Sequence, residues 1–295
     1  MMKGTIISSD VRLLDRWNGG LQGEVHSVYS GAIYLRDNHG RLACLTTAEQ
    51  HDGPWIARID RTSFADAAEL GLRQGTAFFV NDSSALHCGR LELAFSHSRK
   101  WDRPLPVFPP MTVSTAILST AKELLLSDGN DGGYKYFFQH KEPADLFATA
   151  LRQRGQLLLT ALRHSRFAEA KTHGLSLIGL GHGLTPSGDD FLAALITVFH
   201  LPGGPFPEEC RQIGQCWATA ADSTTTTVGA LLLHTAAEGR AREPVSEFIA
   251  ALATNQTEAI LQAARQVLAF GSCSGTDWLA GLIAGVEAGW ELIHR

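Results

Sequence analysis

The feature that most constrains this chain is a short pattern that occurs twice. Ser187 to Ala193 reads SGDDFLA and Ser274 to Ala280 reads SGTDWLA, so both copies follow S-G-x-D-aromatic-L-A and continue into Leu and Ile. A serine followed by an aspartate three residues later, ahead of an apolar run, is typical of a capped helix start. The sequence therefore predicts two helices that begin alike, with Ser187 and Ser274 as N-caps.

The chain ahead of the first copy contains more glycine than a cap requires. Gly179, Gly181, Gly183 and Gly188 lie within GLGHGLTPSG, and glycine allows a backbone to lie close against a ligand. A loop that opens into a helix presents unpaired N–H groups and the positive end of the helix dipole, which suits a carboxylate or a phosphate. We expect this loop to bind a small anionic substrate.

The residues that follow the loop restrict its chemistry. Gly183 and Gly188 have the spacing of a P-loop, but Asp189 and Asp190 stand where that motif needs Lys and Ser or Thr. Paired carboxylates should bind Mg²⁺, accept hydrogen bonds from an amide or guanidinium, or pair with a basic group. Because Asp190 is expected to be occupied in capping, Asp189 is our catalytic candidate. His182 is the second, as a donor or proton carrier, and a tolerated substitution is the alternative.

Further hydroxyls precede a third predicted helix. Residues 223–227 read STTTT ahead of VGALLLHTAAEG, and a single cap explains only one of these side chains. The predicted substrate-binding residues are Gly181, Gly183, Thr185, Ser187, Gly188, Asp190, Thr226, Thr227, Ser274, Gly275 and Asp277. The sequence contains no H-E-x-x-H or C-x-x-C pattern, so we expect no metal site and no cofactor, with Mg²⁺ as the possible exception. Cys273 is more typical of a small buried residue than of a nucleophile.

Two regions of different character predict an α+β protein. Residues 1–105 read as a small β-barrel or sandwich, and residues 106–295 as an all-helical domain, with the boundary in the proline-rich segment 99–111. Candidate strands are residues 4–8, 24–37, 41–47, 55–60, 76–81 and 91–96, with a short helix at 63–70. Apolar stripes predict helices around residues 116–125, 146–151 and 260–268, with Pro143 in a first helical turn. Residues 127–133, SDGNDGG, lack the acidic residue that completes a calcium loop, which predicts a flexible turn.

Composition excludes several classes of partner. A hydrophobic content of 44% with 19% charged residues is typical of a globular protein, and the net charge of −5 gives no reason to expect nucleic acid or an anionic membrane. The sequence MMKGTIISSD has no long apolar run, so we expect no signal peptide, and no apolar run in the chain reaches membrane-spanning length. Five cysteines without a C-x-x-C pair indicate reduced thiols. We therefore expect a cytoplasmic protein.

Three segments together resemble a known bacterial family. GLGHGLTPSGDDFLAAL, the hydroxyl run ahead of VGALLLHTAAEG, and SGTDWLAGLIAG look like the family of AllH, a subunit of the oxamate carbamoyltransferase of allantoin breakdown, and of the YahE proteins. The resemblance implies carbamoyl transfer in purine catabolism, with oxamate, oxalurate or carbamoyl phosphate as ligand, and partner subunits. His182 departs from the family pattern, in which proline is expected. Two alternatives stay open, a non-catalytic assembly subunit and a Mg²⁺- or nucleotide-dependent enzyme.

Overall fold

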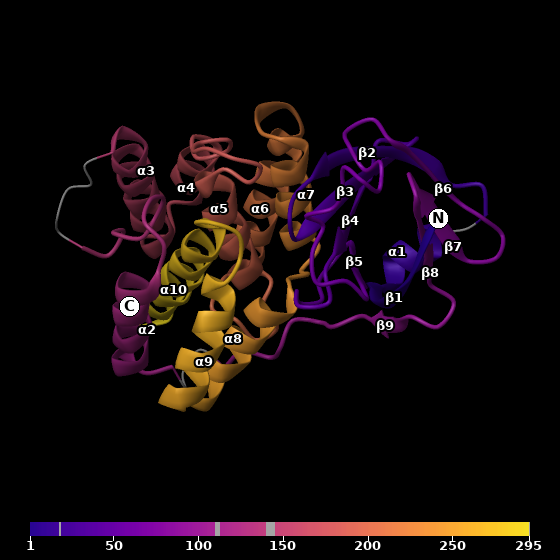
Figure 1. Cartoon of the computed structure of the whole chain (residues 1–295). Helices are drawn as coiled ribbons and strands as arrows, with labels where there is room; N and C mark the ends of the chain where they lie inside the picture. The colour runs from indigo at the N-terminus through magenta and orange to yellow at the C-terminus, as the bar shows by residue number, and fades with distance from the viewer. Residues whose placement is uncertain (18, 110–112, 140–144, 295) are drawn as a thin grey trace. The chain divides into compact units, whose positions relative to one another are not determined.

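The computed structural model describes residues 1–17, 19–109, 113–139 and 145–294 of the chain. These residues form two compact units, Met1–Arg103 and Pro104–Arg295 (Figure 1). The first unit is built from strands and the second from helices, so the predicted α+β class is confirmed. Pro110 and Pro143, which entered the predictions for the domain boundary and a helix start, lie outside the described residues.

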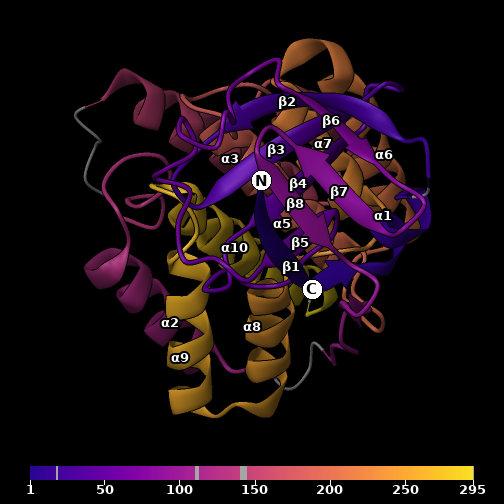
Figure 2. The same ribbon diagram turned by 45° about the vertical axis from the view of Figure 1, so that its right-hand side comes forward.

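The N-terminal unit is a β-barrel (Figure 2). Its strands are β1 (Met2–Asp10), β2 (Gln22–Val28), β3 (Ala32–Asp37), β4 (Leu42–Thr46), β5 (Ile56–Ile59), β6 (Ala77–Val80), β7 (Ala85–Cys88), β8 (Leu91–Ala94) and β9 (Arg99–Trp101). Neighbouring strands follow the order β5-β4-β3-β2-β6-β7-β8-β1, and pairing of β5 with β1 closes the ring, while β9 adds to β1 in parallel. Apolar side chains such as Ile6, Val25 and Leu93, all 0% exposed, form the core of the barrel. Closure leaves these eight strands without a free edge.

Local patterns misassigned several elements of the barrel. Residues 24–37 are two strands rather than one, because a tight turn closed by Tyr29 N to Ala32 O at 2.8 Å separates β2 from β3. Helix α1 (Val11–Arg16), β7 and β9 were not predicted. The helix expected at residues 63–70 is wrong, since this stretch consists of successive turns that end at Gly71, where φ is +71°.

The C-terminal unit is a helical bundle. Its helices are α2 (Thr115–Asp128), α3 (Leu146–Arg163), α4 (Phe167–Leu175), α5 (Ser187–Phe199), α6 (Glu208–Thr224), α7 (Thr227–Ala237), α8 (Glu243–Thr254), α9 (Thr257–Leu268) and α10 (Ser274–Ile293). The predicted apolar stripes of α2 and α9 are buried except at two positions, because Ala116 is exposed and Leu261 is half-buried. The stripe at the start of α3 is out of phase, because Leu146 is 85% exposed and Phe147 40% exposed.

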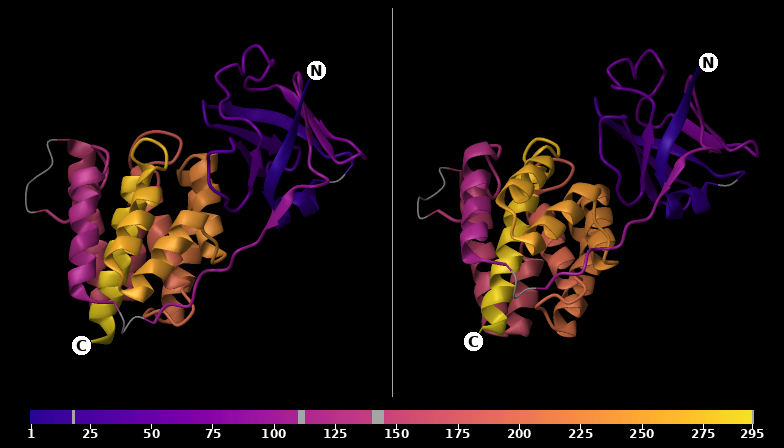
Figure 3. Two further views of the ribbon diagram at one scale, coloured as in Figure 1. Left: turned by 60° about the horizontal axis from the view of Figure 1, so that its bottom comes forward. Right: turned by 90° about the horizontal axis from the view of Figure 1, so that it is seen from below.

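The two helices that carry the repeated pattern pack against each other at the centre of this bundle. Helix α10, the yellow helix that ends at the C-terminus in Figure 3, contacts α2, α3, α5 and α9. Its contact with α5 is the most extensive of these. Gly281 and Gly285 make the close approach possible, because a Cβ at Gly281 would lie 2.7 Å from the Ala194 Cβ and the Phe191 carbonyl oxygen. Every residue of α5 is buried. This packing brings the starts of α5 and α10 together.

Candidate functional site

The starts of α5 and α10 are in direct contact, although they are far apart in the sequence. The Thr185 Oγ1 and Ser274 Oγ atoms are 2.9 Å apart, within hydrogen-bond distance. The indole N–H of Trp278 on α10 donates to Asp190 Oδ1 on α5 over 3.1 Å. The aromatic residue of the second pattern therefore donates a hydrogen bond to the second aspartate of the first pattern.

The predicted capping boxes are wrong. Helix α5 has Pro186 as its N-cap and α10 has Cys273, neither makes a side-chain cap hydrogen bond, and both serines are the first residues of their helices. The carbonyl of Leu180 accepts from Gly188 N at 2.9 Å, and that of Phe270 accepts from Gly275 N at 3.0 Å. Backbone carbonyls thus satisfy donors that a capping side chain would otherwise satisfy.

The glycine of the repeated pattern is required by close packing. A Cβ at Gly188 would lie 2.0 Å from the Leu177 carbonyl oxygen, and one at Gly275 would lie 2.3 Å from that of Val267. No side chain tolerates such a distance. The two copies therefore share one local structure, in which the helix start lies against the end of the preceding segment.

Asp189 is fully engaged with other parts of the protein. Its Oδ1 accepts from Gly179 N at 2.8 Å and its Oδ2 from the Thr225 hydroxyl, and a Cβ at Gly229 would lie 2.4 Å from Oδ2. Burial raises the pKa of Asp189, while the two hydrogen bonds lower it. The expectation that Asp189 is freer than Asp190 is wrong, because both of its oxygens have donors. A direct catalytic role for Asp189 stays a prediction, and these contacts favour a positioning role.

Asp190 and Asp277 occupy equivalent positions in the two patterns and share an unusual feature. Each carboxyl accepts one hydrogen bond through Oδ1, from the Trp278 indole and from Tyr134 N at 2.7 Å respectively, while each Oδ2 is buried without a hydrogen-bond partner. The side chains are 1% and 0% exposed. A buried carboxylate oxygen without a donor is costly when charged.

The surroundings of Asp190 and Asp277 raise the pKa of both carboxyls. Burial, and then the charge of Asp277, raise the pKa of Asp190 well above its ordinary value, and the nearby hydroxyls of Ser274 and Thr185 oppose the shift. Burial raises the pKa of Asp277 to about 7. The Tyr134 N–H and the side chains of Ser187 and Cys273 act in the opposite direction and lower this pKa. The serine of each pattern therefore lies near the aspartate of the other.

Residues 127–133, expected to be a flexible turn, are instead anchored to the start of α10. Asn130 N donates to Thr276 Oγ1 at 2.9 Å, and its side-chain amide donates to the Ser272 carbonyl. A Cβ at Gly133 would lie 2.0 Å from Asp277 Oδ1, which explains the glycine there. The neighbouring Tyr134 ring stacks on Phe191 with 4.1 Å between centroids. Sequence reasoning missed these residues, although the paired glycines were a signal of close backbone approach.

The glycine loop itself forms the accessible side of the site. Residues 181–185 are half-buried or exposed, and their backbone N–H groups have no acceptor in the described part of the chain. Gly181 and Gly183 have φ of +128° and +94°, in the region that favours glycine. Thr226, the N-cap of α7, accepts from Gly229 N and donates to the Leu184 carbonyl at 2.5 Å. The loop is therefore attached to α7 while its own donors stay unused.

The remaining candidates lie at the edge of this cluster. His182 is exposed, and its ring meets Phe147 edge to face with 4.3 Å between centroids. Thr227 is exposed at the first position of α7. Burial raises the pKa of the Cys273 thiol, and the charge of Asp277 adds to this rise, so Cys273 lacks the environment of a nucleophile.

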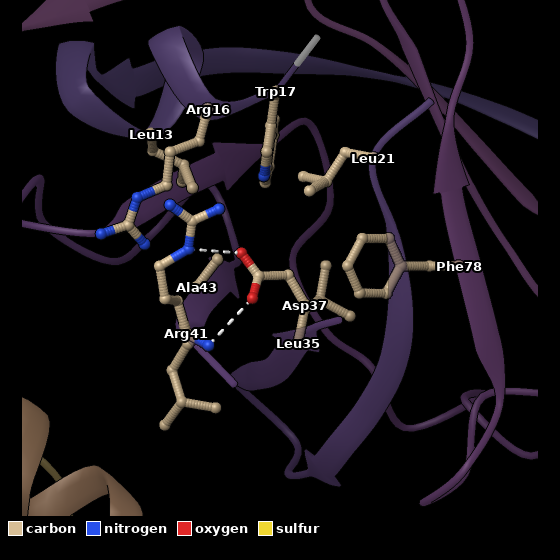
Figure 4. A pocket seen from close by; sticks show the side chains of 10 residues that line it. Leu13, Arg16, Trp17, Leu21, Leu35, Asp37, Arg41, Ala43 and Phe78 are labelled. Atoms are coloured by element: carbon tan, nitrogen blue, oxygen red, sulfur yellow. Dashed lines mark hydrogen bonds and ion pairs between the residues drawn. The ribbon is translucent and has the colours of Figure 1, made fainter. Parts of the chain in front are cut away.

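Hollows among the described residues outside this cluster include an open one of about 380 Å³, which is lined by Asp60, Arg61, Thr62, Ser63, Ala65 and Asp66. Among the described residues, no group of three or more His, Cys, Asp or Glu side chains could hold a metal ion, and no helix is long and apolar enough to cross a bilayer. A cavity in the barrel near Trp17 and Phe78 has a volume of about 10 Å³, enough for one water. An ion pair of Arg41 Nε with Asp37 Oδ2, at 2.8 Å, lies in its wall (Figure 4).

Comparison with known proteins covers both units of the chain. Residues 177–286 match the family model described as oxamate carbamoyltransferase subunit AllH, and residues 5–100 match the AllH family N-terminal domain. No solved structure matches the chain. The first match spans the glycine loop and the starts of α5, α7 and α10, and the second spans nearly the whole barrel. The chain therefore belongs to the AllH family of carbamoyltransferase subunits.

Proposed function

We propose that this chain binds the small anionic substrate of an oxamate carbamoyltransferase at the joined starts of α5 and α10. The observation that carries the proposal is the convergence there of two helix N-termini, the unused N–H groups of residues 181–185, and the hydroxyls of Thr185 and Ser274. Helix N-termini and free backbone N–H groups together are suited to a carboxylate or phosphate. Oxamate, oxalurate and carbamoyl phosphate all carry such a group.

The proposed chemistry divides the site into two layers. In carbamoyl transfer, the carbonyl oxygen and the leaving phosphate gain negative charge in the transition state, so aligned donors stabilise it. The outer layer, Gly181 to Thr185 with Ser274, supplies those donors. The inner layer, Asp189, Asp190 and Asp277, positions the loop and the helix starts. Partner subunits, which the family description implies, would supply the rest of the active site, and the resemblance to AllH would place the reaction in allantoin breakdown.

Ligand titration tests this proposal directly. Thermal unfolding of the purified chain should be followed with oxamate, oxalurate and carbamoyl phosphate, because a ligand at about 100 times its Kd adds about 2.7 kcal/mol to stability. Thr185→Val and Ser274→Ala each remove one hydroxyl and should weaken this stabilisation. In the complex with its partner subunits, each should lower kcat by roughly 10²-fold if the hydroxyl contacts developing charge.

A matched control is available on α2. Ser119 is exposed, and its hydroxyl lies 3.4 Å from Glu123 Oε1, remote in sequence from the repeated pattern. Ser119→Ala should therefore leave ligand stabilisation and turnover unchanged. Full turnover by Thr185→Val and Ser274→Ala would remove these hydroxyls from the proposed site.

A second function is favoured by a different observation. The glycines and aspartates of both patterns are explained by contacts within the protein, as an assembly subunit without a substrate would also require. In that case none of the three ligands stabilises the chain, while the Gly188 and Gly275 positions still govern assembly. Repeating the titration with Mg²⁺ and then with a chelator tests the third alternative, a Mg²⁺- or nucleotide-dependent enzyme.

A further inference from the structure

We propose that Asp190 and Asp277 are positioning residues which couple anion binding at the helix starts to the uptake of a proton. The inference rests on the proposed function and deepens it, since it assigns a role to two buried side chains of the inner layer. The geometry that carries it is the pair of fully buried Oδ2 atoms without a partner, one at each of two contacting helix N-termini. Two equivalent orphan acceptors at one site call for a proton or another donor.

The groups around Asp190 and Asp277 determine which hydrogen bonds a bound proton can make. Asp190 faces the Trp278 indole, the Ser274 and Thr185 hydroxyls, Asp277 and, on its own helix, Asp189. Asp277 faces the Tyr134 N–H, the Ser187 hydroxyl and the Cys273 thiol. Arg154 on α3 lowers the pKa of the neighbouring Tyr134 phenol, and no cation among the described residues contributes to the raised pKa of either carboxyl. The described surroundings thus offer the carboxylates neutral donors rather than a salt bridge.

Protonation changes the direction in which the hydroxyls donate. An ionised carboxyl of this pair only accepts hydrogen bonds. It attracts the hydrogens of the hydroxyls beside it, which are those of Ser274 and Thr185 for Asp190 and that of Ser187 for Asp277, although none of them is in hydrogen-bond geometry with an Oδ2 atom in this structure. When a proton from solvent binds to the carboxylate, the resulting O–H donates to a hydroxyl oxygen, and a hydroxyl hydrogen is released toward the loop. An anion bound there then gains a donor and loses a repelling charge.

The pH range follows from the same groups. Burial raises the pKa of Asp277 to about 7 and that of Asp190 well above its ordinary value. As pH rises through about 7, Asp277 ionises in the free protein, and an anion must then draw a proton back in order to bind. Affinity for the anion should fall by up to about tenfold per pH unit above that point, with uptake approaching one proton.

The experiment is calorimetric titration of the whole chain with oxamate and with sulfate, neither of which titrates between about pH 6 and about pH 9. Measurement in two buffers of different ionisation enthalpy gives the number of protons taken up. Asp277→Asn, whose amide keeps an acceptor and adds a donor, should bind both anions with little pH dependence and without the uptake. If Asp277→Asn fails to fold, Asp190→Asn takes its place, and it too should bind both anions with little pH dependence and without proton uptake. Asp131→Asn, which changes a carboxylate with an 82% exposed side chain in the segment 127–133, should behave as the wild type.

The outcomes separate this inference from the proposed function. Proton uptake by the wild type that disappears in Asp277→Asn supports the coupling. Anion binding without uptake, or uptake that persists unchanged in both variants, overturns the coupling and leaves the proposed function intact. If neither anion binds the wild type at any pH, the proposed function fails, and the coupling fails with it.

Discussion

Replacing Asp277 by asparagine should change how the stability of the helical unit depends on pH. The wild-type carboxyl is 0% exposed and its pKa rises from 3.8 to about 7. At about 1.36 kcal/mol per unit, a rise of roughly three units corresponds to about 4 kcal/mol between the two protonation states. A buried acid with a raised pKa stabilises the fold below its unfolded pKa, and this contribution is lost as pH rises through the folded value.

The wild type should therefore lose up to about 4 kcal/mol of unfolding free energy from this group between about pH 4 and about pH 7. The amide introduced by Asp277→Asn cannot ionise, and its oxygen can still accept the Tyr134 N–H that lies 2.7 Å from Asp277 Oδ1 in the wild type. Above about pH 7 the variant should be the more stable protein, with a flatter profile across the whole range.

Urea unfolding followed by the helical circular-dichroism signal measures this difference, because long helices lie in the C-terminal unit. Asp131→Asn is the control and should keep the wild-type slope. The reasoning is refuted if Asp277→Asn follows the wild type at every pH, or if it is the less stable protein above about pH 7.

Two further changes test the packing that brings the helix starts together. Gly188→Ala and Gly275→Ala should each destabilise the helical unit by about 3 kcal/mol, because the new Cβ would lie 2.0 Å or 2.3 Å from a carbonyl oxygen. Equilibrium unfolding measures the change in unfolding free energy. A loss smaller than the error of the method would contradict this prediction. Trp278→Phe should cost about 1–3 kcal/mol, because it leaves both oxygens of buried Asp190 without a donor. Asp190→Asn in the Trp278→Phe background should recover part of that loss, and a purely additive double variant would argue against their coupling.

The sequence predicted the class of the fold because its signals are local. Alternating apolar residues indicate strands, and periodic stripes indicate helices, so a β-rich unit ahead of a helical one could be inferred. Closure of the barrel depends on pairing between β1 and β5, which no local pattern encodes. The false helix at residues 63–70 has the composition of a helix but folds as successive turns.

At the candidate site, too, local patterns predicted the elements but not the contacts between distant segments. The repeated pattern predicted two similar helix starts, and both exist. It did not predict that carbonyls of preceding segments would satisfy the first N–H groups, which made the capping boxes unnecessary. It was also wrong about which carboxyl is freer, since Asp189 has donors on both oxygens and Asp190 on one, and the partners Thr225 and Trp278 are brought near only in the folded chain.

Hydrogen exchange at the backbone amides of residues 181–185 tests the central claim most directly. These N–H groups have no acceptor in the described part of the chain, so they should exchange rapidly in the free protein. Saturating oxamate or oxalurate should slow exchange at these amides and at the first turns of α5 and α10. Unchanged exchange in this segment under conditions where either ligand binds, or protection confined to another part of the chain, would contradict the account.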